Sequence, residues 1–377
     1  MSINSTLKRE GIEIIKPLST LEINKIASKI AEKLCSTYPE HNLNQSDLFI
    51  SISRLNMYIA KMPDDMAVAK YLYKNDSIYF SEKMDFDDLN ALAIHECIHF
   101  LQEVKDKRGK VTRLGLYNLQ GKTSGMALNE AAVQYMASKA NQCEADTVRY
   151  YNMNLTTESP DYYPLETAII RQLAYFTGTY PLFHSVLYSN DVFKNTFIAK
   201  SNAKAYNVIE SNLDLLMHYQ EELVISINTL DFYSENDASL GKIKNLSNRI
   251  EALKSIILKL TLEIQNTIID NCFNTEFNYV KDQDSLNSFQ AHLYNFKDLL
   301  IDTEGYNYYN EFYRDMMNKL EEKRELIKKY GILTFFEESN KDLALFENPT
   351  YGVEFFKKLF AKLRLLFEEK IRVKNIE

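Results

Sequence analysis

Prolines are absent from a long internal stretch of this chain, and this absence strongly limits the folds that it can adopt. The sequence has 377 residues and seven prolines, none of which lies between positions 182 and 348. Glycine is also rare there, with only Gly241, Gly305 and Gly331. Because proline and glycine most often interrupt helices, we expect this stretch to consist mainly of long helices.

Apolar residues within this stretch recur at alternating steps of three and four, which is typical of a coiled coil or a long helical hairpin. The series comprises Ile243, Leu246, Ile250, Leu253, Ile257, Leu260 and Ile264. Further helices are predicted at 289–300 and 307–330, the second ending at Gly331. A basic amphipathic helix is predicted at 353–371, which either packs against its neighbours or binds an anionic membrane or a partner. These helices also offer surfaces for self-association.

The residues before 182 have a mixed pattern. Ser19 precedes an amphipathic run and is expected to cap a helix over 20–37. The turn pair Asn75–Asp76 separates two apolar runs and predicts a hairpin. The expected strands are 48–60, 68–73 and 77–81, and the further expected helices are 88–105, 127–141 and 165–177, with Asp85, Asp87 and Asp88 as candidate caps of the first.

Two domains are expected, because a chain of this length exceeds the usual size of one hydrophobic core. The first, over residues 1–185, is an α+β domain with a small antiparallel sheet. The second, over residues 186–377, is all-helical and contains the long hairpin or coiled-coil helices. The predicted fold class is therefore α+β, with helices predominating.

Composition excludes several classes of protein. A net charge of -8 argues against a nucleic-acid binder. The four cysteines are far apart and form no CxxC pair, which suits a reducing compartment. No signal peptide and no membrane-spanning run is expected, because the apolar stretches are too short. The cytoplasm is the expected location.

Residues 95–99 read HECIH, and this motif indicates a metal site. Four residues of helix advance by about 400°, so His95 and His99 share one face and can reach one zinc ion at about 2.0–2.1 Å. Glu96 lies beside them, where it can accept a proton from the metal-bound water. The motif arises by chance in about one such chain in a hundred. Apart from Glu96, residues 92–102 contain no charged side chain, as expected for a helix buried below a cleft.

Tetrahedral zinc in a catalytic site needs a third protein ligand and leaves its fourth position to water. The longer motif HExxHxxGxxH would need glycine at 102 and histidine at 105, but the chain has Gln102 and Lys105. Glu103 continues the same predicted helix and would point poorly at the metal. Glu130 is the better candidate, because a separate predicted helix can approach the metal from its open side.

HECIH followed by LNEAAVQYMA resembles the gluzincin arrangement of thermolysin-like and related zinc peptidases, over about residues 90–140. The resemblance implies a zincin-like catalytic domain over residues 1–185. It also implies three zinc ligands and one general base. The ligands would be His95, His99 and Glu130, and the base would be Glu96.

Two neighbours of Glu130 bear on this resemblance. Asn129 matches the asparagine that commonly precedes the third ligand. Gln134 stands where thermolysin-like enzymes usually have an aspartate. A glutamine oxygen can still accept a hydrogen bond from a ligand histidine, but it raises the basicity of that histidine less than a carboxylate does.

Peptide hydrolysis also needs a donor that stabilises the oxyanion. Downstream candidates are Tyr150, Tyr151, Arg171, Tyr180 and His184, of which His184 is preferred. The alternative for His184, which lies among apolar residues, is a core position. Residues 77–81 are a candidate edge strand that holds an extended substrate, or else an ordinary strand.

The sequence thus predicts a zinc-dependent metallopeptidase that cleaves peptide or protein substrates with a zinc-bound water activated by Glu96. One alternative is a helical interaction or scaffold protein that retains a zinc site without turnover. Another is a zinc hydrolase that acts on a substrate other than a peptide. A fourth protein ligand would favour the scaffold, whereas an open fourth position would favour an enzyme.

Overall fold

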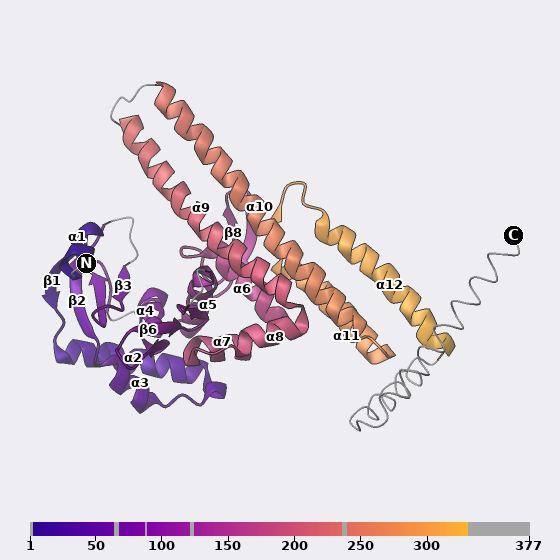
Figure 1. The fold of residues 1–377 in the computed structure, drawn as a ribbon, viewed down its shortest axis with the longest axis horizontal. Coiled ribbons are helices and arrows are strands. Elements are labelled where there is room, and N and C mark those ends of the chain that lie inside the picture. Colours follow the sequence, from indigo (N-terminus) through magenta and orange to yellow (C-terminus); the bar gives the residue numbers. More distant parts are fainter. Residues whose placement is uncertain (1–2, 64–67, 87–88, 121–123, 236–239, 331–377) are drawn as a thin grey trace, which may run out of the picture. The chain divides into compact units, whose positions relative to one another are not determined.

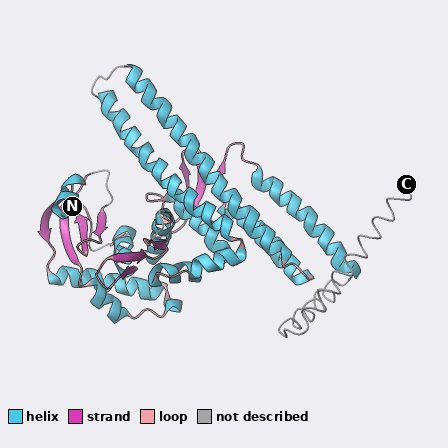
Figure 2. Ribbon diagram, viewed as in Figure 1, coloured by secondary structure: helices cyan, strands magenta, loops and turns pink. Residues whose placement is uncertain are grey.

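The computed structural model describes residues 3–63, 68–86, 89–120, 124–235 and 240–330, and helices predominate within them (Figures 1 and 2). The helices are α1 (Ile3–Arg9), α2 (Thr20–Thr37), η1 (Pro39–His41), α3 (Gln45–Ile52), α4 (Ala91–Leu101), α5 (Met126–Ala140), α6 (Pro164–Thr177), α7 (Thr179–Tyr188), α8 (Val192–Lys200), α9 (Ala203–Glu235), α10 (Leu240–Asn278), α11 (Gln283–Asn295), η2 (Phe296–Leu299) and α12 (Tyr308–Tyr330). None of these helices combines the length and the apolar character that crossing a membrane requires.

The strands form three small sheets. Their bounds are β1 (Glu13–Pro17), β2 (Asn56–Lys61), β3 (Ala69–Leu72), β4 (Ser77–Ser81), β5 (Glu103–Lys105), β6 (Val111–Leu114), β7 (Tyr117–Asn118), β8 (Asp146–Tyr150), β9 (Met153–Thr157) and β10 (Asp302–Thr303). The largest sheet has the order β1-β2-β4-β3, and the others have the orders β5-β6-β7 and β10-β9-β8. All pairs are antiparallel except β2 with β4, which is parallel.

The predicted hairpin is confirmed, because β3 and β4 pair antiparallel on either side of Asn75–Asp76. Of the two possibilities for residues 77–81, the ordinary strand is confirmed and the substrate-holding edge strand is wrong. This strand, β4, lies between β2 and β3 and is buried along its whole length. The edge strand that contacts α4 is β3.

The prediction of a strand over residues 48–60 is also partly wrong. Its first half belongs to α3, and only its second half is a strand, β2. Asn44 starts the helix by accepting hydrogen bonds from the backbone N–H groups of Ser46 and Asp47. A short apolar run fits a buried helix or a strand equally well, so this cap decides the local structure.

Helix α4 is shorter than the predicted 88–105. Asn90 caps it by accepting a hydrogen bond from the Ala93 N–H at 3.2 Å, and the helix ends at Leu101. Residues 103–105 leave the helix as β5, which pairs with β6. The candidate caps Asp87 and Asp88 lie outside the described residues.

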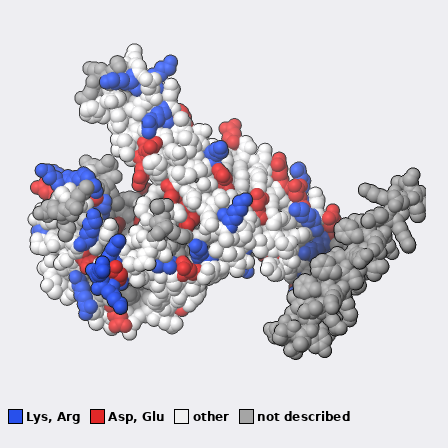
Figure 3. Space-filling view, viewed as in Figure 1, with Lys and Arg blue, Asp and Glu red and all other residues white. Residues whose placement is uncertain are grey.

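The expectation of long helices after residue 182 is confirmed. Helices α9 and α10 run side by side as a hairpin, and Arg249 of α10 pairs with Glu222 of α9 at 3.1 Å (Figure 1). The predicted heptad series lies within α10, where Ile250, Leu253 and Ile257 are buried. Basic and acidic side chains are interspersed along this hairpin on the face in Figure 3, as is typical of exposed helices.

The chain divides into two compact units. The first contains residues 1–276 and 293–310, so a boundary at residue 185 falls inside its helix α7. Of the described residues, the second contains 277–292 and 311–330. Within the second unit, Phe277 contacts the Phe289 ring, and Lys323 donates to the Phe277 carbonyl at 2.9 Å. Gly331 and the predicted helix over 353–371 lie outside the described residues.

Candidate metal centre

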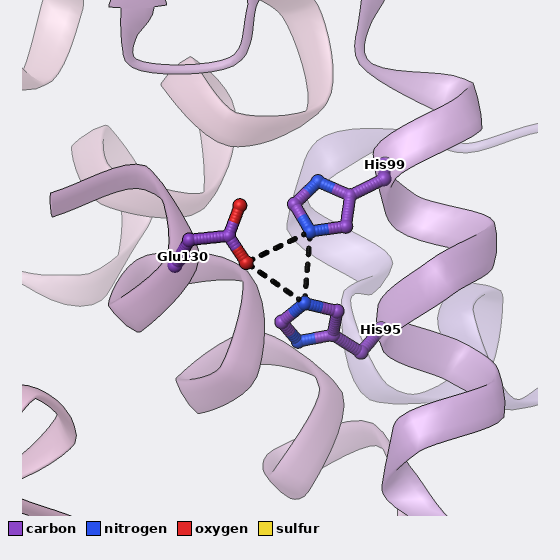
Figure 4. A group of neighbouring side chains, drawn as sticks. All are labelled: His95, His99 and Glu130. Atoms are coloured by element: carbon purple, nitrogen blue, oxygen red, sulfur yellow. Dashed lines mark hydrogen bonds and ion pairs between the residues drawn. The ribbon is translucent and has the colours of Figure 1, made fainter. Parts of the chain in front are cut away.

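Helices α4 and α5 pack against each other and bring three predicted ligands together (Figure 4). The Nε2 atoms of His95 and His99 lie 2.8 Å apart. Oε2 of Glu130 lies 3.3 Å from the first and 3.2 Å from the second. His95 is buried, and the other two side chains are partly buried.

This geometry can hold a metal ion. Ligand atoms at about 2.0–2.1 Å from a tetrahedral ion lie about 3.3 Å from one another. Both distances from Glu130 to the imidazoles match this spacing, and the distance between the two imidazoles is slightly shorter. Among the described residues, this is the single cluster of at least three His, Cys, Asp or Glu side chains with convergent ligand atoms.

A glutamine orients His95 through Nδ1, the ring nitrogen that does not face Glu130 and His99. Oε1 of Gln134 lies 2.9 Å from Nδ1 of His95. The amide nitrogen of Gln134 donates to the hydroxyls of Ser159 at 2.8 Å and Ser138 at 3.3 Å. Because both serines accept from the amide nitrogen, its oxygen faces the imidazole. His95 therefore carries its proton on Nδ1 and directs the Nε2 lone pair at the metal position.

A second glutamine lies beside His99. The side-chain amide of Gln102 lies 2.7 Å from Nδ1 of His99, and the other end of this amide has no hydrogen-bond partner. A 180° rotation of the amide puts its oxygen on the Nδ1–H group, as a metal-bound imidazole requires. The amide nitrogen would then take the Oε1 position next to Gly115. Oδ1 of Asn129 lies on the same side of Gly115 and accepts from the Leu116 N–H at 3.0 Å.

Gly115 leaves the space for this arrangement. Its φ of +52° lies in the left-handed region, and a Cβ there would lie 2.3 Å from Oε1 of Gln102 and 2.4 Å from Oδ1 of Asn129. Any larger residue would push both amides away from their present positions. The turn between β6 and β7 therefore supports the His99 side of the cluster.

Glu130 and Glu96 differ in the pKa of their carboxyl groups. Burial would raise the pKa of Glu130, but His99 and His95 outweigh burial and hold that pKa well below its usual range. Burial raises the pKa of Glu96 to about 7, and the nearby Glu130 adds to this increase. Glu130 is thus an anion that could bind a cation, whereas Glu96 is the more basic of the two carboxylates.

His95, His99 and Glu130 are called the ligand cluster below. Glu96 is not part of it and points to the edge strand β3. Its Oε2 accepts a hydrogen bond from the Tyr71 N–H of β3 at 2.7 Å. Cys97 is fully buried on the same helix, as expected for a core residue. The helix therefore presents the two histidines and the glutamate to the site and directs the cysteine into the core.

Tyr163 adds an aromatic wall that the sequence did not reveal. Its ring lies 6.3 Å from the ring of His95 with an interplanar angle of 15°. Burial raises the pKa of its phenol, and Glu130 and Glu96 raise that pKa further, so the hydroxyl remains a donor at neutral pH. The backbone of Tyr163 is left-handed, with φ of 53°, and Pro164 then begins α6. A non-glycine residue in this conformation is often found at a functional site.

The downstream donor candidates make their contacts elsewhere. His184 lies among the rings of Tyr180, Tyr188 and His41, and none of its ring contacts within the described chain involves the ligand cluster. Arg171 pairs with Glu158 at 3.3 Å. Tyr150 and Tyr151 pack against each other with ring centroids 4.2 Å apart.

Three residues with roles around the cluster were not singled out as functional from the sequence: Tyr71, Gln102 and Tyr163. A weak signal existed for Tyr163, which forms a Tyr-Pro pair directly before a predicted helix. Gln102 lies three residues after His99, which places both on one helical face if the helix continues. Tyr71 gave no signal, because its role depends on which strand lies at the sheet edge.

Comparisons of the chain with protein-family models, curated proteins and solved structures found no significant match. The local geometry of the cluster is therefore the basis for any functional assignment.

Proposed function

We propose that this chain is a zinc-dependent metallopeptidase with a zincin-like catalytic region. The observation that carries the proposal is the convergence of the ligand atoms of His95, His99 and Glu130. Glu96 lies next to this cluster but contributes no ligand atom to it, because its carboxylate pairs with the Tyr71 N–H. The described residues supply three ligating groups, which leaves a fourth position for water, as in catalytic zinc sites. Two nitrogen ligands and one carboxylate suit zinc.

Each side chain then has a role. A bound zinc ion would lower the pKa of its water ligand and polarise the substrate carbonyl. Glu96 would accept the proton of the attacking water and pass it to the leaving amine. Gln134 and Gln102 would hold the ligand imidazoles in the correct tautomer.

Tyr163 is our candidate for the oxyanion donor, in place of His184. Its ring lies against His95, and its phenol stays protonated at neutral pH because burial and nearby carboxylates raise its pKa. Because a neutral phenol can donate a hydrogen bond, Tyr163 would stabilise the developing oxyanion.

The proposed substrate is a peptide, which would lie along the edge strand β3. The Tyr71 N–H donates to Glu96, so an extended chain could pair with the carbonyl that Tyr71 turns away from β4, in the manner of an added strand. We also propose the cytoplasm as the location, in keeping with four free cysteines. Self-association or partner binding through the C-terminal helices stays a prediction, supported by exposed Ile225, Phe232 and Leu240 on α9 and α10.

The test is the Glu96→Gln variant, assayed with a library of peptides and with metal analysis by mass spectrometry. We expect hydrolysis to fall by at least about a hundredfold, because the general base is lost, while zinc content stays at about one ion per chain. His95→Ala is the matched control for the metal and should lose zinc. Full activity of Glu96→Gln would refute the mechanism, and equal zinc in His95→Ala would refute the site.

The alternatives make different predictions in the same experiment. A scaffold protein would bind zinc and cleave no peptide in its wild-type form. A hydrolase for other substrates would also leave the peptide library intact, but it would cleave other ester or amide compounds in a manner that depends on Glu96.

A further inference from the structure

Tyr71 contacts α4, the helix that carries His95 and His99, and the segment that follows it, through both its backbone and its side chain. The residue lies on β3, the edge strand next to α4. Its N–H donates to Oε2 of Glu96 at 2.7 Å. Its hydroxyl donates to Oε1 of Glu103 at 2.8 Å and lies 3.3 Å from Oδ1 of Asp76. One residue therefore links the proposed base to the segment that follows α4.

The Tyr71 hydroxyl belongs to a network of hydrogen bonds and ion pairs with Asp76, Glu103 and Lys105. Nζ of Lys105 lies 2.7 Å from Asp76 and 2.8 Å from Glu103, so the two carboxylates share the lysine and the phenol. The Glu103 side chain is only 3% exposed, which limits screening by solvent. Glu103 lies two residues after the end of α4, and the Tyr71 ring packs edge-on against Phe100 at 6.0 Å. This network attaches β3 to the C-terminal end of the helix.

The direction of the Tyr71 N–H follows from the strand pairing. The Val68 carbonyl accepts from the Ser81 N–H, so residue 68 faces β4. Backbone groups alternate along a strand, so Lys70 and Leu72 also face β4 and Tyr71 faces outwards. The Tyr71 N–H is therefore free of the sheet, and Glu96 accepts its hydrogen bond.

We propose that Tyr71 is the positioning residue for Glu96. The Glu96 side chain has three rotatable bonds, and its carboxylate needs a fixed partner to stay beside the ligand cluster. The backbone of Tyr71 supplies that partner, and its hydroxyl fixes the strand that carries the backbone. The consequence for catalysis rests on the proposed function, whereas the consequence for the hydrogen bond does not.

The first experiment measures hydrogen exchange at single amides by NMR in the full chain. In the wild type, amide 71 should be protected by Glu96. In Glu96→Ala and in Tyr71→Phe, its exchange should accelerate by about tenfold, because a hydrogen bond to a charged group is lost or loosened. Amides 70 and 72, which face β4, should exchange as in the wild type.

The matched control is Tyr58→Phe, because Tyr58 lies on β2 of the same sheet and stacks on Tyr79. This variant should leave amide 71 protected. Unchanged protection of amide 71 in Tyr71→Phe would overturn the proposal. Equal acceleration of amides 70, 71 and 72 would also overturn it, because Tyr71 would then support the whole strand.

The second experiment uses a cleaved peptide and a double-mutant cycle with Glu96→Asp, which already misplaces the carboxylate. Tyr71→Phe should lower kcat about tenfold in the wild type with KM nearly unchanged, but less than about twofold in Glu96→Asp. Equal losses in both backgrounds would show that Tyr71 does not act through Glu96. If no peptide is cleaved at all, the proposed function fails, and the exchange experiment still decides whether Tyr71 holds Glu96.

Discussion

Glu166 should make the stability of this protein fall as the pH rises. It lies in the first turn of α6 and is fully buried. Neither carboxylate oxygen has a well-formed hydrogen bond, and the lowering of the pKa by the residue's own backbone N–H and by the Gln220 side chain only partly offsets burial. Burial therefore raises the pKa of Glu166 from its ordinary 4.5 to about 7.

The sign follows from proton binding in the two states. Between pH 4.5 and about 7 the folded protein keeps a proton on Glu166 that the unfolded chain has released. The contribution is complete below pH 4.5, is lost through this window, and levels off above pH 7. At about 1.4 kcal/mol per pKa unit, the loss amounts to about 3 kcal/mol.

The assay compares wild type with Glu166→Gln by urea unfolding at pH 5 and pH 8, both without metal, because metal binding has its own pH dependence. Glutamine resembles the protonated acid, so the variant should match the wild type at low pH and exceed it by about 2–3 kcal/mol at pH 8. Other titrating groups, including Glu96 and Glu130, are common to both proteins and cancel in the comparison. Parallel pH profiles for the two proteins would refute the reasoning.

Two further predictions concern the support of the ligand helix α5. Gln134→Ala should weaken zinc binding by about 10–100-fold in competition with a chelating dye, because His95 loses its orienting partner, whereas Gln142→Ala at an exposed position should not. Asp214→Ala should cost about 1–2 kcal/mol in urea unfolding, because its carboxylate accepts from the N–H groups of Gly125 and Ala127 at 2.6 and 2.8 Å and so caps α5. Asp231→Ala, on the exposed part of α9, is its control, and equal losses in both variants would contradict the capping role.

Several secondary-structure elements could be predicted from local signals. Ser19 and Glu22 form a capping box, and α2 begins and ends where the sequence indicated. The long helices followed from the missing prolines, because no residue interrupts them. The predictions for residues 48–60 and 103–105 were wrong because the local pattern of apolar and polar residues does not decide the secondary structure there. A side-chain cap selected helix at the first site, and pairing with β6 selected strand at the second.

The ligand cluster was easier to predict than its surroundings. His95 and His99 are four residues apart on one helix, so their proximity is a local property. Bringing Glu130 to them requires α4 and α5 to pack. This was inferred from the separate predicted helix and from a resemblance, and it is what the structure has. Tyr163 and Tyr71 reach the site only through tertiary packing, so spacing along the chain could not single them out.

The charges around the cluster suggest why a metal would also stabilise the fold. Glu130 is anionic, and Glu96 and the Tyr163 phenol both have pKa values raised by burial and by neighbouring carboxylates. Without a cation, the site must keep some of these groups protonated or accept their mutual repulsion. The two glutamines that face the ligand imidazoles are neutral, so they add no further negative charge. A divalent ion with Glu130 as its anionic ligand would leave a net positive centre, which favours ionised Glu96 and an acidic bound water. Under the proposed function, the same charge balance would therefore both favour metal binding and prepare Glu96 to act as the base.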